Sequence, residues 1–159
     1  MATQHKNLSP FNKADIPSAK GMRIGIVVAN WNEEVTNGLL QGAKQTLLEC
    51  GALESNIIIM EVPGSFELVF GAKLMSKQKV DAIICLGSVI QGETKHFDFV
   101  CNTVSIGIKD LNIVLNIPVI FGVLTDNNLQ QAKDRSGGKH GNKGVESAIT
   151  AIKMAHLNK

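Results

Sequence analysis

Four short apolar runs, separated by longer amphipathic segments, are the feature that most restricts how this chain can fold. The runs occupy residues 22–29, 57–62, 82–90 and 117–123, and the first of them reads MRIGIVVA. Each run is nearly continuous in aliphatic residues, which is typical of a strand that is buried on both faces. Such strands occur in parallel sheets whose connections are helices.

The segments between these runs have apolar residues at every third or fourth position and are predicted to be helices. We expect helices over residues 34–50, 66–77, 97–115, 127–136 and 144–157. The third of them carries one apolar face, made of Val100, Val104, Ile108, Leu111 and Leu115. The alternation predicts an α/β fold in three layers, with a four-stranded parallel sheet flanked by helices on both faces, as in flavodoxin-like proteins.

The first 20 residues differ in composition from the rest of the chain. They are polar, contain Pro10 and Pro17, and lack the apolar segment of a secretory signal. We expect an N-terminal arm over residues 1–20, either flexible or adding a strand to a neighbouring chain, and a single α/β domain over residues 21–159. No run of about 18 apolar residues is present, so no membrane partner is expected. Three widely spaced cysteines indicate free thiols and a cytoplasmic location.

Charge and turn composition argue against several functional classes. The formal net charge is only +2, with acids and bases interleaved, so no nucleic acid partner is expected. Residues 87–94, GSVIQGET, resemble a nucleotide phosphate loop but have Glu93 where that loop needs lysine. The turn after the first strand, ANWNEE, lacks the glycines of a dinucleotide-binding site. A receiver domain would need an aspartate after the third strand, where this chain has Ser88.

Ligands of parallel α/β sheets bind beyond the carboxyl ends of the strands, which selects four corners of this chain. The corners are residues 30–32, 63–67, 91–96 and 124–127. They carry the only tryptophan, Trp31, together with the carboxylate of Glu67, the hydroxyl of Thr94 and the imidazole of His96. These groups predict a site that stacks a flat ring, binds hydroxyls and a phosphate, and transfers protons.

Each of these residues also has a purely structural interpretation. Thr94 fits either a helix cap or a hydroxyl that binds phosphate. His96 fits either a polar surface residue or a proton-transfer group. Glu67 fits either a residue that stabilises a helix N-terminus or a carboxylate that binds ligand hydroxyls. Arg135 fits either a favourable charge at a helix C-terminus or a fork for phosphate.

Five segments, in this order, resemble the 6,7-dimethyl-8-ribityllumazine synthase family. They are RIGIVVANWN, VPGSFEL, LGSVIQGETKHFDFVCN, IPVIFGVLT and DRSGGKHGNKG, and the resemblance covers residues 22–155. It implies a transferase of the penultimate step of riboflavin biosynthesis. This enzyme condenses 5-amino-6-(D-ribitylamino)uracil with 3,4-dihydroxy-2-butanone 4-phosphate and releases phosphate and water. The resemblance implies neither a cofactor nor a metal.

The resemblance also implies the roles of particular residues. His96 would transfer protons, and Glu93, Thr94 and Arg135 would bind phosphate. The other substrate-binding positions would be Trp31, Ser65, Phe66, Glu67, Ser88, Val89, Ile90, Phe121 and Lys143. In the family the pocket lies between neighbouring subunits of a pentamer, so Phe121 is expected to face the partner subunit's Trp31.

The resemblance leaves the assembly and the exact activity open. The glycine-rich segment 136–144 carries no insertion, which favours a 60-subunit icosahedral shell over a pentamer or decamer, and riboflavin synthase is an expected partner. The alternatives are a riboflavin synthase of the same fold and a non-catalytic flavin- or lumazine-binding shell protein. Two positions depart from the family pattern: Gln91 stands where arginine is common, and Val69 where proline is common.

Overall fold

The computed structural model describes residue 7 and residues 9–158, which alternate strands and helices as the apolar runs predict. The strands are β1 (Ile24–Ala29), β2 (Ile57–Val62), β3 (Ala82–Ile90), β4 (Val119–Asp126), β5 (Ser136–Gly138) and β6 (Gly141–Asn142). The α-helices are α1 (Glu33–Glu49), α2 (Leu68–Met75), α3 (His96–Val114), α4 (Leu129–Arg135) and α5 (Lys143–Leu157). Short 3-10 turns occupy Lys13–Asp15, Glu54–Asn56, Ser65–Glu67 and Ser76–Gln78.

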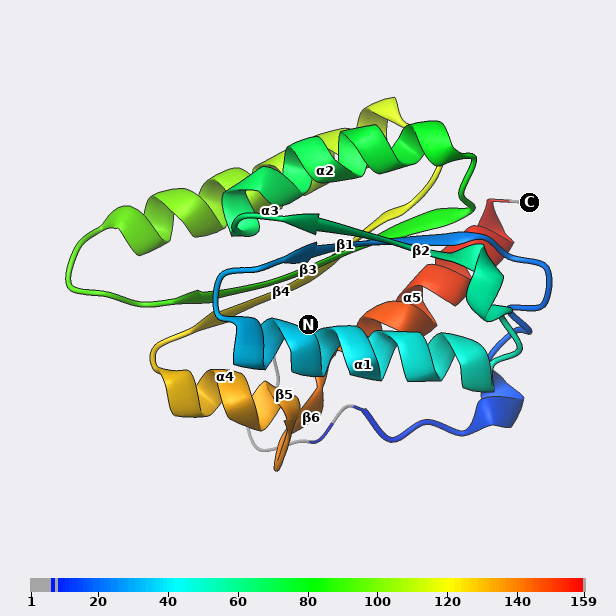
Figure 1. The fold of residues 1–159 in the computed structure, drawn as a ribbon, viewed down its shortest axis with the longest axis horizontal. Coiled ribbons are helices and arrows are strands. Elements are labelled where there is room, and N and C mark those ends of the chain that lie inside the picture. Colours follow the sequence, from blue (N-terminus) through cyan, green and yellow to red (C-terminus); the bar gives the residue numbers. More distant parts are fainter. Residues whose placement is uncertain (1–6, 8, 159) are drawn as a thin grey trace.

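The central sheet is parallel throughout and has the strand order β2-β1-β3-β4. Helices α2 and α3 cover one face, and α1, α4 and α5 cover the other (Figure 1). The predicted three-layer α/β architecture is therefore confirmed. All six residues of β1 are buried, because this strand lies between two neighbours and under helices on both sides.

Two apolar cores lie on the two faces of the sheet. Alternate residues of β1 contribute to each: Ile24 and Ile26 pack toward α1 and α5, whereas Val27 and Ala29 pack toward α2 and α3. The predicted inward stripe of α3 is also confirmed. Its central members are buried and both of its ends are partly buried, in the order Val100, Val104, Ile108, Leu111 and Leu115.

Strand β4 begins two residues later than the sequence predicts and continues to Asp126. The side chain of Asn112 fixes its start, because it accepts a hydrogen bond from the Val119 N–H (2.9 Å) and donates one to the Val119 carbonyl (2.7 Å). At the other end Thr125 and Asp126 pair with Val89 and Ile90. The sequence did not predict this end of the strand, because its side chains are polar and interrupt the apolar run.

The glycine-rich segment after α4, which the sequence analysis left without regular structure, forms a small antiparallel hairpin of β5 and β6. The part of the predicted arm nearest the domain packs on the core that α1 covers: Ala19 is fully buried, and Phe11 and Ile16 are partly buried against the same cluster. Residues 1–6 and 8 of the arm lie outside the described residues. All three cysteines are free thiols, and Cys101 is only partly buried. None of the described helices is both long enough and apolar enough to cross a membrane.

Candidate active site

A cavity of about 530 Å³ opens at the carboxyl edge of the sheet. Three of the four corners selected from the sequence contribute to its lining, and these corners follow β1, β2 and β3. Its lining residues are Trp31, Asn32, Gly64, Ser65, Phe66, Glu67, Ser88, Val89, Ile90, Gly92, Thr94, His96, Phe97 and Val100. The connection from β1 runs to β2 on one side, while β3 lies on the other side of β1. The cavity therefore lies at the switch point of the sheet, where ligands of such folds bind.

The corner after β1 presents the indole of Trp31 to this cavity. The backbone N–H of Trp31 donates to the Pro63 carbonyl at 3.1 Å, and this bond continues the pairing of β1 with β2. Its side chain is 72% exposed, so a face of the ring is free to stack on a planar ligand.

Asn32 joins the β1 and β3 corners, and the sequence analysis did not assign it to the site. Its backbone is left-handed (φ 61°, ψ 47°), a conformation that asparagine tolerates better than most residues. Its side chain does not cap α1; instead Nδ2 donates to the Ser88 carbonyl at 3.0 Å. The only signal in the sequence was its place in the corner 30–32, three residues after the end of a buried strand.

The turn of Ser65, Phe66 and Glu67, which follows β2, also lines the cavity. The hydroxyl of Ser65 is buried and has no hydrogen-bond partner among the described residues, and the same holds for Ser88. Buried hydroxyls are ordinarily bonded, so these two groups are available to a ligand. Phe66 and Glu67 are exposed, with the Glu67 carboxylate turned back toward Gly64.

The third corner, residues 91–95, leads into the N-terminus of α3 and extends beyond the sheet in Figure 1. Thr94 Oγ1 accepts the His96 N–H at 3.4 Å, a long bond of the kind that threonine forms in turns. His96 is exposed and lines the cavity beside Thr94. Glu93 is exposed and is not among the lining residues, although its neighbours Gly92 and Thr94 are. The first amides of a helix of 19 residues provide donors and partial positive charge for an anion.

Phe121 and Lys143 lie elsewhere, in a second cavity of about 710 Å³ along β4 and α5. Phe11, Glu146 and Ser147 also line this second cavity. Arg135 is not among the lining residues of either cavity. The residues assigned from the sequence to one site thus divide within a single chain into two groups.

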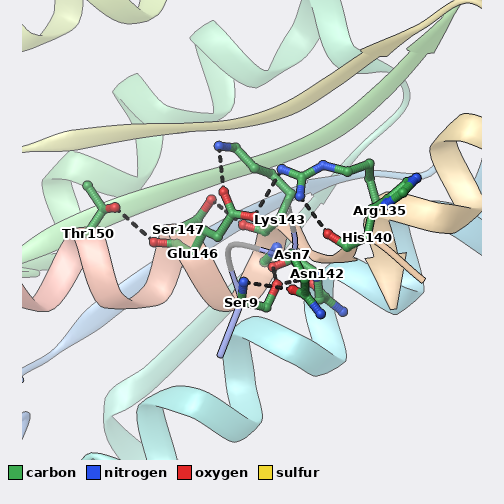
Figure 2. A network of polar contacts seen from close by, with 10 residues as sticks. Asn7, Ser9, Arg135, His140, Asn142, Lys143, Glu146, Ser147 and Thr150 are labelled. Carbon is green, nitrogen blue, oxygen red and sulfur yellow. Dashed lines mark hydrogen bonds and ion pairs between the residues drawn. The ribbon is translucent and has the colours of Figure 1, made fainter. Parts of the chain in front are cut away.

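Arg135 and Lys143 share one carboxylate, that of Glu146 (Figure 2). Arg135 Nη2 lies 3.0 Å from Glu146 Oε1, and Lys143 Nζ lies 3.1 Å from Glu146 Oε2. The first contact is an ion pair rather than an aligned hydrogen bond, because Oε1 has no hydrogen-bond partner among the described residues. Arg135 Nη1 also donates to the His140 carbonyl at 2.8 Å. Glu146 was missed from the sequence, although its spacing of three residues from Lys143 is a usable signal.

Asp126 lies at the end of β4 and is electrostatically coupled to the same arginine. Burial raises the pKa of its carboxyl to about 6, and the positive charge of Arg135 acts in the opposite direction. Its Oδ2 atom is buried and has no hydrogen-bond partner among the described residues. Nowhere in the described chain do three His, Cys, Asp or Glu side chains group as a metal site would require.

The two groups of residues differ in what they can bind. The first cavity, with its exposed indole and its two hydroxyls, can hold a flat polar ligand. The cations Arg135 and Lys143 are suited to an oxyanion.

Comparison with known proteins gives a consistent result. The family model described as 6,7-dimethyl-8-ribityllumazine synthase matches residues 21–159. A protein of that name from Christiangramia forsetii is 60% identical over 161 residues, which is 100% of this chain and 96% of the relative. One from Flavobacterium johnsoniae is 60% identical over 158 residues, or 99% of this chain and 83% of the relative. One from Parabacteroides distasonis is 51% identical over 159 residues and covers 99% of both chains.

Proposed function

Because this chain belongs to the 6,7-dimethyl-8-ribityllumazine synthase family, we propose that it catalyses the reaction for which the family is named. The enzyme condenses 5-amino-6-(D-ribitylamino)uracil with 3,4-dihydroxy-2-butanone 4-phosphate. An amine of the pyrimidine attacks the ketone to form an imine, phosphate is eliminated, and the ring closes with the loss of two waters in all. The observation that carries this assignment is that one cavity joins Trp31, Glu67, Thr94 and His96 from three separate corners.

The residues of the cavity match the needs of this reaction. The indole of Trp31 stacks on the pyrimidine ring, and the unpaired hydroxyls of Ser65 and Ser88 bond to polar groups of that substrate. Phe66 and Glu67 hold its ribityl chain, and Val89 and Ile90 line its ring.

The phosphate and the moving protons require groups of a different kind. Thr94 and the main chain at Glu93 bind the phosphate at the N-terminus of α3, with Arg135 as the balancing cation and Lys143 beside it. His96 shuttles the protons that imine formation and elimination require. The substrate supplies its own amine, so the chain needs no catalytic lysine.

The direct test is to mix the purified protein with the two substrates and follow the absorbance and fluorescence of the lumazine together with phosphate release. Equimolar lumazine and phosphate are expected. A riboflavin synthase of this fold would consume lumazine without releasing phosphate. A non-catalytic binding protein would bind flavin or lumazine and form neither product. Either result would reject the proposed reaction.

The division of the site residues between two cavities supports an assembly in which subunits complete one another. We infer that the second cavity, with Phe121 and Lys143, faces the first cavity of a neighbouring subunit within a pentamer. Helix α3 supports such an assembly, since Phe99, Ile106 and Ile113 recur at intervals of seven residues and are each more than half exposed.

The open edge of the sheet supports a role for the arm. Strand β2 lies at this edge, and Ile59 is 41% exposed there. An apolar edge strand is an aggregation hazard unless another strand or segment covers it. We propose that residues 1–20 are an arm whose outer part adds a strand to a neighbour, and that residues 21–159 are the catalytic domain.

The larger assembly and the cellular setting follow from the same proposal. Twelve pentamers closing into a 60-subunit icosahedral capsid is the proposed form. Sedimentation at the mass of five or ten chains would reject it. The lumazine product is the substrate that a riboflavin synthase consumes, so that enzyme is the proposed partner, and the cytoplasm is the proposed location.

A further inference from the structure

Asn142 connects three elements of the fold through its side-chain amide. Nδ2 donates to the Gly38 carbonyl of α1 at 2.8 Å and to the Ser136 carbonyl of β5 at 3.2 Å. Oδ1 accepts from the Gly144 N–H at the start of α5 at 2.8 Å. Both kinds of polar atom in the amide are thus occupied, which fixes its orientation.

Helix α1 is shaped to receive this contact. A Cβ atom at Gly42 would lie 2.5 Å from the amide of Asn142, and one at Gly38 would lie 2.4 Å from the Ser136 carbonyl oxygen. Any side chain at either position would displace the hairpin from α1. The two glycines are one helical turn apart and form a flat surface on which the β5–β6 hairpin lies.

The hairpin that Asn142 holds carries the two cations of the charge network at its two ends. Arg135 directly precedes Ser136, whose carbonyl Asn142 binds, and Lys143 directly follows Asn142. Arg135 also donates to the carbonyl of His140 at the hairpin turn, and both cations pair with Glu146. Displacement of Asn142 would therefore move Arg135 relative to α5, the helix that carries Lys143 and Glu146.

The backbone between these cations has little rigidity of its own. Three of the seven residues 136–142 are glycine, which loses more conformational freedom on folding than any other residue. A guanidinium binds phosphate as a fork only when its position is fixed. The main chain of Asn142 is held as well, since its N–H donates to Ser9 Oγ and its carbonyl accepts from the same hydroxyl at 3.2 Å.

We propose that Asn142 is a positioning residue for the phosphate-bearing substrate and acts through Arg135 and Lys143. This role rests on the proposed function. In the proposed reaction Asn142 touches no substrate atom. Its amide sets the distance between two cations that lie eight residues apart in the chain.

The kinetic test compares KM for each substrate separately in the wild type and in Asn142→Ala. The variant should raise KM for the butanone phosphate about tenfold, which corresponds to 1.4 kcal/mol and to roughly one lost hydrogen bond. KM for the pyrimidine should change less than about twofold, because none of the groups that bind Asn142 lines the first cavity. An unchanged KM for the butanone phosphate in an active, folded variant would overturn the proposal.

Two further variants separate positioning from folding. Asn142→Asp keeps the acceptor for the Gly144 N–H but loses both donors, so it should raise the same KM while retaining the cap of α5. If this variant kept the wild-type KM for the butanone phosphate, Asn142 would serve only as the N-cap of α5 and the proposal would be rejected. Ile83→Val is the control for general destabilisation: it removes one methylene from the fully buried core under α2 and α3, which costs about 0.5–1.5 kcal/mol, and Ile83 lines neither cavity. An equal KM rise in this control would attribute the effect to general destabilisation.

The double variant tests the route through Arg135. In an Arg135→Ala background, Asn142→Ala should raise KM for the butanone phosphate by much less than tenfold, since Lys143 is then the only cation that it still positions. A full tenfold rise in that background would show that Asn142 acts independently and would reject the proposed route. A wild-type protein that forms no lumazine would reject the proposed function instead.

Discussion

Replacing Glu146 by glutamine is expected to destabilise this protein much more than breaking an ion pair on its surface. The Glu146 carboxylate contacts Arg135 at 3.0 Å and Lys143 at 3.1 Å. The three side chains are only 13–20% exposed. Glutamine preserves the shape of the side chain and one acceptor oxygen but removes the charge that both cations share.

The size of the effect follows from burial. Removing one partner of a fully buried ion pair costs about 3–5 kcal/mol, whereas exposed pairs contribute about 0.2–1 kcal/mol. The network is mostly but not fully buried, and glutamine keeps one hydrogen-bond acceptor, so we expect a loss of about 2 kcal/mol. For a chain of 159 residues this lowers Tm by roughly 4–8 °C.

Thermal unfolding at one fixed protein concentration measures this loss, and the concentration must be held constant because the proposed assembly would contribute to stability. Glu54→Gln is the matched control: Glu54 pairs with Lys44 at the shorter distance of 2.7 Å but is 72% exposed. Its Tm should show no resolvable change, since many surface pairs contribute nothing measurable. Equal shifts in the two variants would refute the argument from burial.

Four other outcomes follow from the site. His96→Ala should lower kcat by at most about 10²–10⁴-fold, because orientation of two substrates contributes most of the acceleration; complete loss of turnover with intact binding would contradict this. Arg135→Ala should mainly raise KM for the butanone phosphate, which steady-state kinetics would measure, and an unchanged KM would count against the phosphate role. Asp126→Asn should raise Tm at pH 7 but not at pH 4. Because the pKa of the Asp126 carboxyl is raised to about 6 in the folded protein, the protein loses folding stability as pH rises from about 4 to 6, and asparagine avoids this loss. An equal shift of Tm at both pH values would contradict that sign. The fluorescence of Trp31, the only tryptophan, should change when the pyrimidine binds, and a saturated sample with unchanged emission would exclude stacking.

The sequence predicted the sheet well because each strand is a local apolar signal. The continuous run of β1 and the inward stripe of α3 both depend on a short period that can be read directly from the chain. The end of β4 was missed because Thr125 and Asp126 are polar and pair with β3 through main-chain groups only. The β5–β6 hairpin was missed because glycine-rich segments carry no apolar period.

The site was predictable where a residue type has a narrow chemical use and less so where partners are distant in the chain. A single exposed tryptophan next to a buried strand is conspicuous. Asn32 and Asn142 were missed, because an asparagine after a strand or inside a loop gives no hint of its partners Ser88 and Gly38, which lie 56 and 104 residues away. These contacts depend on the packing of whole elements, which no local pattern encodes.

The separation of the polar groups of the first cavity from the charge network of Arg135, Lys143 and Glu146 has a simple electrostatic interpretation. The first cavity contributes an exposed aromatic ring and unpaired hydroxyls, which suit a neutral heterocycle. The other group holds two cations against one close carboxylate, with a second carboxylate, Asp126, coupled to Arg135. Keeping the cations paired with Glu146 in the single chain limits the cost of burying them. In the proposed pentamer, their distance from the first cavity makes the complete site depend on contact between subunits, so assembly and activity are expected to be lost together.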